Sequence, residues 1–122
     1  MRPLEIDRLE DREEVFRERF DTYRREFLRM LVTPEVVEEH RRSPWGQHSE
    51  PLERLLIYIR QRPAAQKYAV KVVKPFAAYR IVALSGHRGT PPREVGEEVY
   101  ASVREACHGI FLRHIQELME AG

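Results

Sequence analysis

The sequence predicts an α+β fold: three N-terminal helices, an antiparallel β-hairpin or three-strand meander, and a C-terminal helix packed on it. Three observations predict this class. Apolar residues recur at three- and four-residue steps in the first half and near the C-terminus, which is the period of a helix. Between these segments, two runs rich in β-branched and aromatic residues flank a Lys-Pro-Phe turn. The length of 122 residues fits one domain with a modest core.

The first helix is expected over residues 7–31, as the first part of a single domain that spans residues 1–122. Acid-first pairs such as Glu13 with Arg17 support it. With its flanks this helix covers residues 1–32, and two arrangements are open. It packs along the core of residues 33–122, or it reaches a partner or a second copy of the chain as an interface. Its apolar positions share one stripe and are Leu9, Phe16, Phe20, Tyr23, Phe27 and Met30 or Leu31.

Two shorter helices follow. Thr33 is a suitable cap and Pro34 a suitable first residue for a helix that ends near Arg42, because Pro44 disfavours helical backbone at the residue before it. Ser49 is the expected cap of the next helix, which stops before Pro63. This helix is the most apolar and belongs in the core through Leu52, Leu55, Leu56, Ile57 and Ile59.

The period then changes from helical to alternating. Residues 67–73 and 77–84 are the expected hairpin strands, with Tyr68, Val70 and Val72 on one face of the first and Tyr79, Ile81 and Ala83 on one face of the second. A loop over 85–96 leads to a third short strand over 97–101. Ser102 and Glu105 form a capping box that opens a last helix to about residue 120. Its apolar face is Val103, Ala106, Cys107, Ile110, Phe111, His114, Ile115 and Leu118.

Composition limits the class of protein. Apolar residues make up 42% and charged residues 34%, so the chain can fold but carries an ionic surface. The net charge of +1 gives no bulk attraction to nucleic acid or to an anionic membrane. The single cysteine, Cys107, cannot form an intrachain disulfide and indicates a reducing compartment. Without a signal-peptide pattern or a run of about 20 apolar residues, a cytoplasmic protein with no membrane partner is expected.

Searches for chemistry in the sequence give no strong candidate. The histidines, His40, His48, His87, His108 and His114, have no helical ligand spacing, which leaves only a site assembled in space from His40, His48 and His87. Cys107 lies on an apolar helix face, where it is expected to pack. Ser85-Gly86-His87 lacks the surroundings of a nucleophile elbow. We therefore predict no catalytic, cofactor-binding or metal-ligating residue in this chain.

Nucleic-acid binding by the basic hairpin, residues 67–80, is the alternative function. Tyr68 and Tyr79 are available in the sequence for base stacking, and the basic residues of this region are Lys67, Lys71, Lys74, Arg80 and Arg88. Acids follow closely, however, and neither strand has a glycine-aromatic signature. Lysines on an edge strand also discourage aggregation. The glycine-containing segment 85–90 lacks a phosphate-loop lysine and is expected to be a flexible connection.

A protein interface is the preferred role. The stretch EEHRRSPWGQHSEP, residues 38–51, holds the only tryptophan between two helices. Trp45 either caps the core there or fills a pocket on a partner. Arg, Trp and Tyr are residue types that anchor interfaces. The candidate contact residues are Arg41, Arg42, Trp45 and His48, with Phe16, Phe20, Tyr23 and Phe27 of the first helix as a second set.

Several of these segments resemble one family, the small (alpha) subunit of N,N-dimethylformamidase. The likeness is carried by PEVVEEH (34–40), SPWGQH (43–48), Gln-Arg-Pro (61–63), Lys-Tyr (67–68), Tyr-Arg-Ile (79–81) and HGIFL (108–112). It runs in order over about residues 34–118. The chain departs from the family pattern at Ser43 and Trp45, where the family has Asn and Phe, and in the loop 85–90.

The resemblance implies a role as an accessory subunit. In that family a large subunit carries a mononuclear iron and hydrolyses the amide bond of a small formamide, while the small subunit supplies no catalytic residue. The expected partners are therefore a larger catalytic subunit, a second copy of this chain, or both. No cofactor is expected in this chain itself.

Overall fold

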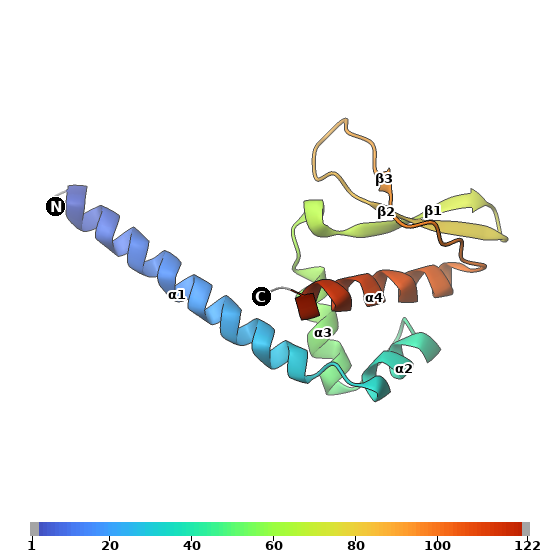
Figure 1. The fold of residues 1–122 in the computed structure, drawn as a ribbon, viewed down its shortest axis with the longest axis horizontal. Helices are drawn as coiled ribbons and strands as arrows, with labels where there is room; N and C mark the ends of the chain where they lie inside the picture. The colour runs from blue at the N-terminus through green and yellow to red at the C-terminus, as the bar shows by residue number, and fades with distance from the viewer. Residues whose placement is uncertain (1–2, 121–122) are drawn as a thin grey trace. The chain divides into compact units, whose positions relative to one another are not determined.

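The structure, a computed structural model, describes residues 3–120 and confirms the α+β class (Figure 1). Its elements differ from the predicted set mainly by one extra 3-10 turn and by the position of the last strand. In chain order they are α1 (Pro3–Met30), α2 (Pro34–Arg42), α3 (Glu50–Arg60), η1 (Ala64–Gln66), β1 (Tyr68–Lys74), β2 (Ala78–Ala83), β3 (Arg93–Glu94) and α4 (Val103–Glu120).

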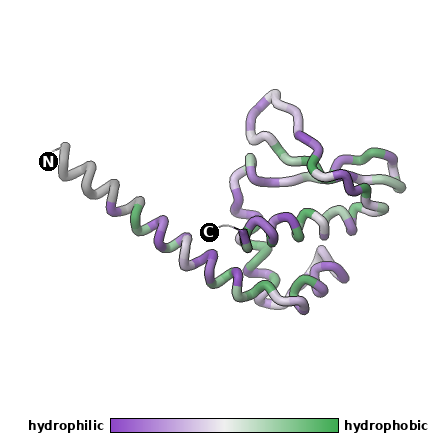
Figure 2. Tube along the Cα trace, in the orientation of Figure 1, coloured by the Kyte–Doolittle hydropathy of each residue, from purple (hydrophilic) through white to green (hydrophobic). Residues whose placement is uncertain are grey.

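The chain divides into two compact units, residues 1–30 and residues 31–122. The first is α1, which begins at Pro3, four residues before the predicted start. Hydrophobic positions recur along its visible part between hydrophilic ones, as the predicted stripe requires (Figure 2). Leu9, the first member of that stripe, lies among residues whose side chains are not described.

The two short helices of the second unit begin as the sequence predicts, but their caps differ. The Val36 N–H donates to the Thr33 hydroxyl at 3.2 Å, which confirms the predicted cap of α2. Ser49 takes the predicted N-cap position of α3, but its side chain makes no capping bond. Instead, the Ser49 N–H and hydroxyl both donate to the Glu39 carboxylate, at 2.7 and 2.6 Å. These bonds lower the pKa of Glu39 and join the start of α3 to α2.

The sheet has the order β1-β2-β3 and is antiparallel throughout. The predicted faces are confirmed, because Val70 pairs with Ile81 and Val72 with Tyr79. The predicted strand over 97–101 is wrong. The chain pairs with β2 earlier, through β3, and then turns at Gly96, whose φ is 69°. Only Tyr100 of the predicted segment pairs, in a single bridge to Tyr79.

The core of the second unit lies where α4 packs on the sheet and against α2 (Figure 1). The predicted capping box begins α4. The Glu105 N–H donates to the Ser102 hydroxyl at 3.1 Å, while the Glu105 carboxylate accepts from Ala101 rather than from Ser102 itself. Val103, predicted on the apolar face, is partly exposed. The buried apolar residues of this unit are Val36, Leu52, Leu55, Leu56, Tyr79, Ile81, Val82, Ala106, Phe111, Ile115 and Leu118.

Gly109 is buried in the middle of α4, where sequence patterns assigned it no role. A Cβ on this residue would lie 2.6 Å from the Tyr100 hydroxyl oxygen and 3.1 Å from Ile81 Cδ1. Side chains essentially never approach so closely, so a glycine is needed for α4 to lie against the sheet and Tyr100.

Gly109→Ala is therefore expected to destabilise the protein by about 1–3 kcal/mol, because overpacking forces neighbours to move. Helix propensity alone predicts the opposite, a gain of about 1 kcal/mol for alanine over glycine. Urea unfolding followed by circular dichroism measures the difference. In a Tyr100→Ala background the cost should shrink or change sign; an equal cost in both backgrounds would show that the close approach is not its cause.

Among the helices described between residues 3 and 120, none combines the length and the hydropathy that crossing a bilayer requires.

Candidate functional site

The predicted aromatic row lies on α1 and is exposed. Between 47% and 72% of the surface of each of its four side chains is accessible. Val15 and Met30 are also exposed and extend the apolar surface along the same helix. The row consists of Phe16, Phe20, Tyr23 and Phe27, whose steps of four, three and four residues place them on one stripe. Exposed aromatic rows of this kind are typical of helices that bind another protein chain.

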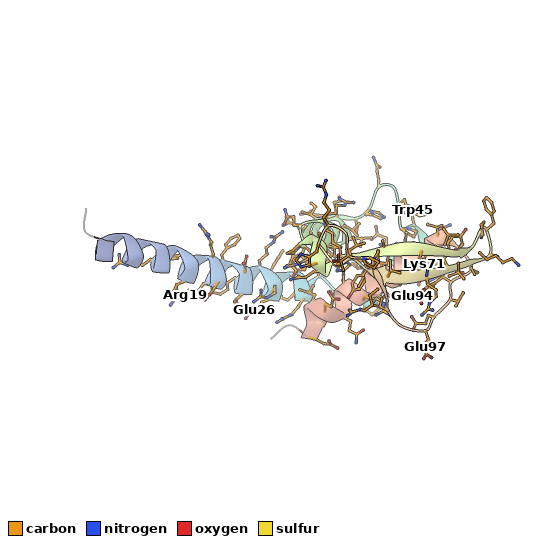
Figure 3. All side chains as sticks on the ribbon, turned by 90° about the horizontal axis from the view of Figure 1, so that it is seen from above. Arg19, Glu26, Trp45, Lys71, Glu94 and Glu97 are labelled. Carbon is orange, nitrogen blue, oxygen red and sulfur yellow. The ribbon has the colours of Figure 1, made fainter. Side chains whose placement is uncertain are left out.

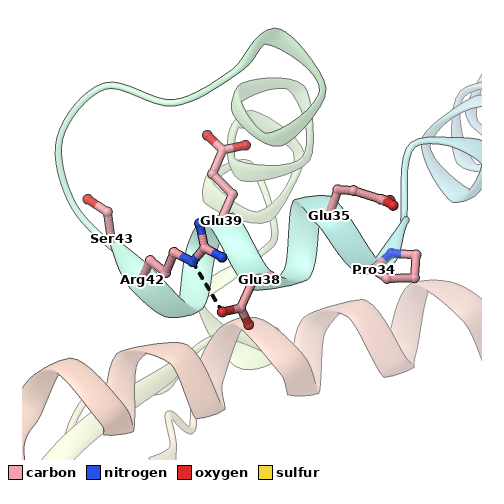
Figure 4. A pocket seen from close by; sticks show the side chains of 6 residues that line it. All are labelled: Pro34, Glu35, Glu38, Glu39, Arg42 and Ser43. Atoms are coloured by element: carbon pink, nitrogen blue, oxygen red, sulfur yellow. Dashed lines mark hydrogen bonds and ion pairs between the residues drawn. The ribbon is translucent and has the colours of Figure 1, made fainter.

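The end of α2 carries the two predicted arginines beside Glu38. Arg41 donates to both Glu38 oxygens, at 2.7 and 2.5 Å, and Arg42 donates to Glu38 Oε1 at 3.2 Å. Figure 4 shows the Arg42–Glu38 contact beside a hollow of about 500 Å³ along α2. The hydrogen bond from Arg41 is the main reason why the pKa of Glu38 falls to about 2. Both arginines remain largely exposed, so they are oriented and still accessible.

The loop after α2 is folded on itself and presents Trp45. The Ser43 hydroxyl donates to the Trp45 carbonyl at 2.7 Å, and His48 Nε2 lies 2.7 Å from the Ser43 carbonyl oxygen. The Trp45 side chain is 57% exposed but reaches Cys107 of α4. Burial raises the pKa of the Cys107 thiol, while its hydrogen bond with Trp45 acts the other way. Trp45 therefore touches α4 with one part and offers the rest to solvent.

His48 supports this loop from inside. Its side chain is only 2% exposed, and its Nδ1 atom lies 3.7 Å from Glu53 Oε2 without a hydrogen-bond partner. A partner would therefore contact the loop that His48 holds, rather than the imidazole itself.

A groove of about 720 Å³ runs between the end of α2 and the start of α4. Arg41, Arg42 and Arg104 contribute basic groups to it, and Val99 and Leu112 contribute exposed apolar surface. Trp45 lies in the loop after α2 and contacts α4 at Cys107, outside the lining of this groove. Arginines beside apolar side chains favour a protein segment that carries both acidic and apolar residues.

The histidines come together in a combination that the sequence did not predict. His40 of α2 and His108 of α4 meet with their Nδ1 atoms 2.8 Å apart, and the His40 ring stacks on Phe111 at 4.0 Å. His87, which the sequence grouped with His40 and His48, is instead exposed in the loop after β2. Phe111, three residues after His108 on the predicted apolar face, is a local hint that His108 lies near the core. His40 and His108 are 68 residues apart, so no local spacing in the sequence links them.

The His40–His108 pair has the geometry of a hydrogen bond. A metal held by both Nδ1 atoms at about 2.0–2.1 Å in tetrahedral geometry would keep them farther apart than this contact. One ring therefore donates its N–H to the other. Within the described residues, no group of three His, Cys, Asp or Glu side chains is arranged to hold a metal ion.

The Ser85 hydroxyl, the other side chain considered for chemistry, is engaged within its own loop. It accepts the His87 N–H at 3.1 Å and lies 3.0 Å from the His87 carbonyl oxygen. No base contacts it among the interactions of this loop, which is closed by its own hydrogen bonds.

An acid on β3 offsets part of the hairpin's basic charge. Glu94 accepts from Lys71 at 2.7 Å and pairs with Arg80 at 2.6 Å; Lys71 and Glu94 are both labelled in Figure 3. The bond from Lys71 is the first cause of the lowered pKa of Glu94.

The two tyrosines proposed for base stacking are also engaged. Tyr79 is buried, and the Tyr68 hydroxyl donates to Glu117 of α4 while its ring packs edge-on against His114. Burial and the bond to Glu117 raise the pKa of Tyr68 to about 12. The expectation that Tyr79 is available to stack a base is therefore wrong, and no observation favours the nucleic-acid alternative.

Comparisons with known proteins agree on one family. The family model described as N,N-dimethylformamidase alpha subunit matches residues 15–122. The chain is 30% identical over 113 residues to the N,N-dimethylformamidase alpha subunit of Paracoccus aminophilus, covering 88% of this chain and 79% of that protein. It is 35% identical over 88 residues to the alpha subunit from an Alcaligenes species, covering 70% of this chain and 65% of the relative.

Proposed function

Because the chain belongs to the N,N-dimethylformamidase alpha-subunit family, we propose that it is a non-catalytic accessory subunit that supports assembly of a larger catalytic subunit. The observation that carries the proposal is the exposed aromatic row of α1. Four large apolar side chains in water are unfavourable unless a partner covers them, and covering such rings is what stabilises most interfaces. The word subunit in the relatives' names supports a multi-chain assembly.

The second contact surface in this proposal consists of the groove between α2 and α4 and of Trp45, which is exposed in the loop after α2. Arg41 and Arg42 of this groove are pre-oriented by Glu38, so little side-chain freedom is lost when they meet a carboxylate. Arg and Trp are also the residue types most enriched among energetically dominant interface positions. The partner segment that fits is acidic and apolar.

The activity belongs, in this proposal, to the assembled enzyme and consists of hydrolysis of the amide bond of a small N-substituted formamide. The substrate class follows the relatives' names, and the iron expected from the family resemblance is assigned to the larger subunit. The assembly is proposed to be cytoplasmic. A second copy of this chain within the same complex is compatible with two interaction surfaces.

Co-expression with the larger subunit tests the proposal. The tagged chain is expected to retain the larger subunit through size-exclusion chromatography, and formamide hydrolysis is expected only when both chains are present. Phe20→Ala with Tyr23→Ala should reduce recovery of the complex by about tenfold or more, because each buried interface aromatic is typically worth about 2 kcal/mol or more.

Thr22→Ala is the matched control for these variants. It changes an exposed residue of α1 beside the row, where Thr22 only donates to the Glu18 carbonyl of its own helix at 2.8 Å. Recovery should stay at the wild-type level. A wild-type chain that remains a stable monomer in the presence of the larger subunit would contradict the proposal.

A further inference from the structure

The turn between β1 and β2 places a phenylalanine where glycine or asparagine is usual. The Ala77 N–H donates to the Lys74 carbonyl at 3.0 Å, which closes a four-residue turn with Pro75 second and Phe76 third. Phe76 has a φ of 62°. Proline followed by a residue with positive φ is the type II pattern, whose third position favours Gly or Asn. A bulky side chain in this left-handed conformation is strained.

Packing within the chain does not offset that strain. The Phe76 side chain is 96% exposed, so its ring is almost entirely in water. Among the described residues, Phe76 is the only one other than glycine with a positive φ. Backbone strain of this kind persists where the surrounding structure enforces it, and it concentrates at functional positions.

The surrounding structure does hold the turn in place. The Phe76 N–H donates to the Tyr79 hydroxyl at 3.1 Å, and Tyr79 is buried in the core. The Tyr79 backbone in turn exchanges two hydrogen bonds with Tyr100, at 2.9 and 2.8 Å. The base of the exposed ring is therefore tied to the rigid part of the sheet. The backbone that carries the ring therefore loses little conformational freedom when the ring binds.

Two valines extend the apolar surface at this end of the hairpin. β1 is an outer strand of the sheet, and the pairing register shifts between Val72 and Lys74. Val72 and Val73 are each about half exposed, so both add apolar surface to the end of β1 that leads into the turn. Lys74 is the only basic residue within residues 72–76, so the tip does not present the cationic cluster that an anionic membrane or nucleic acid would require.

We propose that Phe76, at the hairpin tip, is an anchor that inserts into an apolar pocket of the larger subunit. This inference rests on the proposed function, which supplies a protein partner. A single rigid ring on a projecting turn is convex, so the complementary surface is a concave pocket lined by apolar side chains. The turn keeps phenylalanine at a strained position because the ring acts in the complex and not in the isolated fold.

Three substitutions at this residue distinguish the effect of the ring on binding from the effect of the backbone strain on stability. Phe76→Ala removes the ring and keeps the strain, Phe76→Asn removes the ring and relieves the strain, and Phe76→Tyr keeps the ring. Affinity for the purified larger subunit, measured by interferometry, should fall about tenfold or more in the alanine and asparagine variants and stay near wild type in the tyrosine variant. Met119→Ala, an exposed apolar change on α4, should leave affinity unchanged.

Thermal unfolding of the full-length chain supplies the second readout. Phe76→Asn should raise the melting temperature by a few degrees while weakening the complex, since relief of strain stabilises the free chain. Phe76→Ala should leave it nearly unchanged. A ring that served only the fold would give the reverse result, with lower melting temperatures and unaltered affinity.

A photo-crosslinking phenylalanine analogue at position 76 identifies the occupant in the complex. A crosslink to the larger subunit is expected, and a crosslink to a second copy of this chain, or none, would overturn the inference. If wild type and all Phe76 variants bind the larger subunit equally, only this inference fails. If the wild-type chain does not bind the larger subunit at all, the proposed function is contradicted, and this inference, which rests on it, is contradicted as well.

Discussion

Leu55→Ala is expected to lower the free energy of unfolding by about 2–5 kcal/mol. Leu55 lies in α3 and has no accessible surface, so its truncation removes buried methyl groups and leaves a cavity in a close-packed region. A small domain has a total stability of about 5–15 kcal/mol, so this loss is a large share of what holds the second unit together. Urea unfolding at equilibrium measures it.

Ile57→Ala is the matched control on the same helix. It removes the same number of carbon atoms, but the Ile57 side chain is 42% exposed, so a much smaller loss is expected. Leu55 and Ile57 are only two residues apart, and the sequence predicts both as core residues. Equal losses would contradict the orientation of α3, in which Leu55 is buried and Ile57 faces solvent, and would place Ile57 in the core.

Acidification from pH 6.5 to pH 4 is expected to remove about 3 kcal/mol of stability through His40 alone. Burial, with smaller contributions from the charges of His108 and His48, lowers the pKa of His40 to about 4. The unfolded chain takes up a proton near the ordinary value of 6.5, whereas the folded chain does not. Stability is therefore complete above about pH 6.5 and declines as the pH falls toward 4.

Unfolding measured by urea at half-unit pH steps tests this prediction. His40→Gln should lower stability at neutral pH, because it disturbs the bond to His108 and the stacking on Phe111. It should also flatten the decline between pH 6.5 and 4, by about 1.4 kcal/mol per pH unit where one proton is linked to unfolding. His87→Gln, in an exposed loop, is the control and should leave the slope unchanged.

Other groups act in ways that can be separated from His40. Burial also lowers the pKa values of His108 and His114, so they add to the loss in the same direction. Glu38 acts at lower pH, because its pKa is held near 2 by Arg41 and its contribution is lost only as the pH falls below about 4.5. A variant of His40 that kept the full slope would show that the other histidines carry the transition.

Local signals in the sequence were sufficient for the order of the elements. Thr33 with Pro34, Ser102 with Glu105, and the Lys-Pro-Phe turn placed the starts of α2 and α4 and the hairpin within about two residues, because caps and turns involve neighbouring groups. The segments around residues 34–48 also carried the family resemblance, and the comparisons confirm that family. For the contact residues, the sequence indicated residue types without showing which were accessible.

Contacts between distant segments decided the rest. The Ser49 hydroxyl donates to Glu39 instead of capping α3, and Gly109 is required because Tyr100 lies so close to it. The His48 side chain is buried, whereas the Trp45 side chain remains partly exposed. None of these follows from local spacing, because each depends on how one helix or strand is packed against another.

The sequence by itself therefore determined the α+β class and the helix and strand order, since these depend on periodicity and on residues a few positions apart. It also carried the family resemblance, through segments spread over residues 34–118. Only the tertiary structure decided the pairing of His40 with His108, the ion pairs of Glu94 with Lys71 and Arg80, and the exposure of Phe76 at a strained turn. The physical reason is that burial, ion pairing and backbone strain are set by the packed arrangement as a whole.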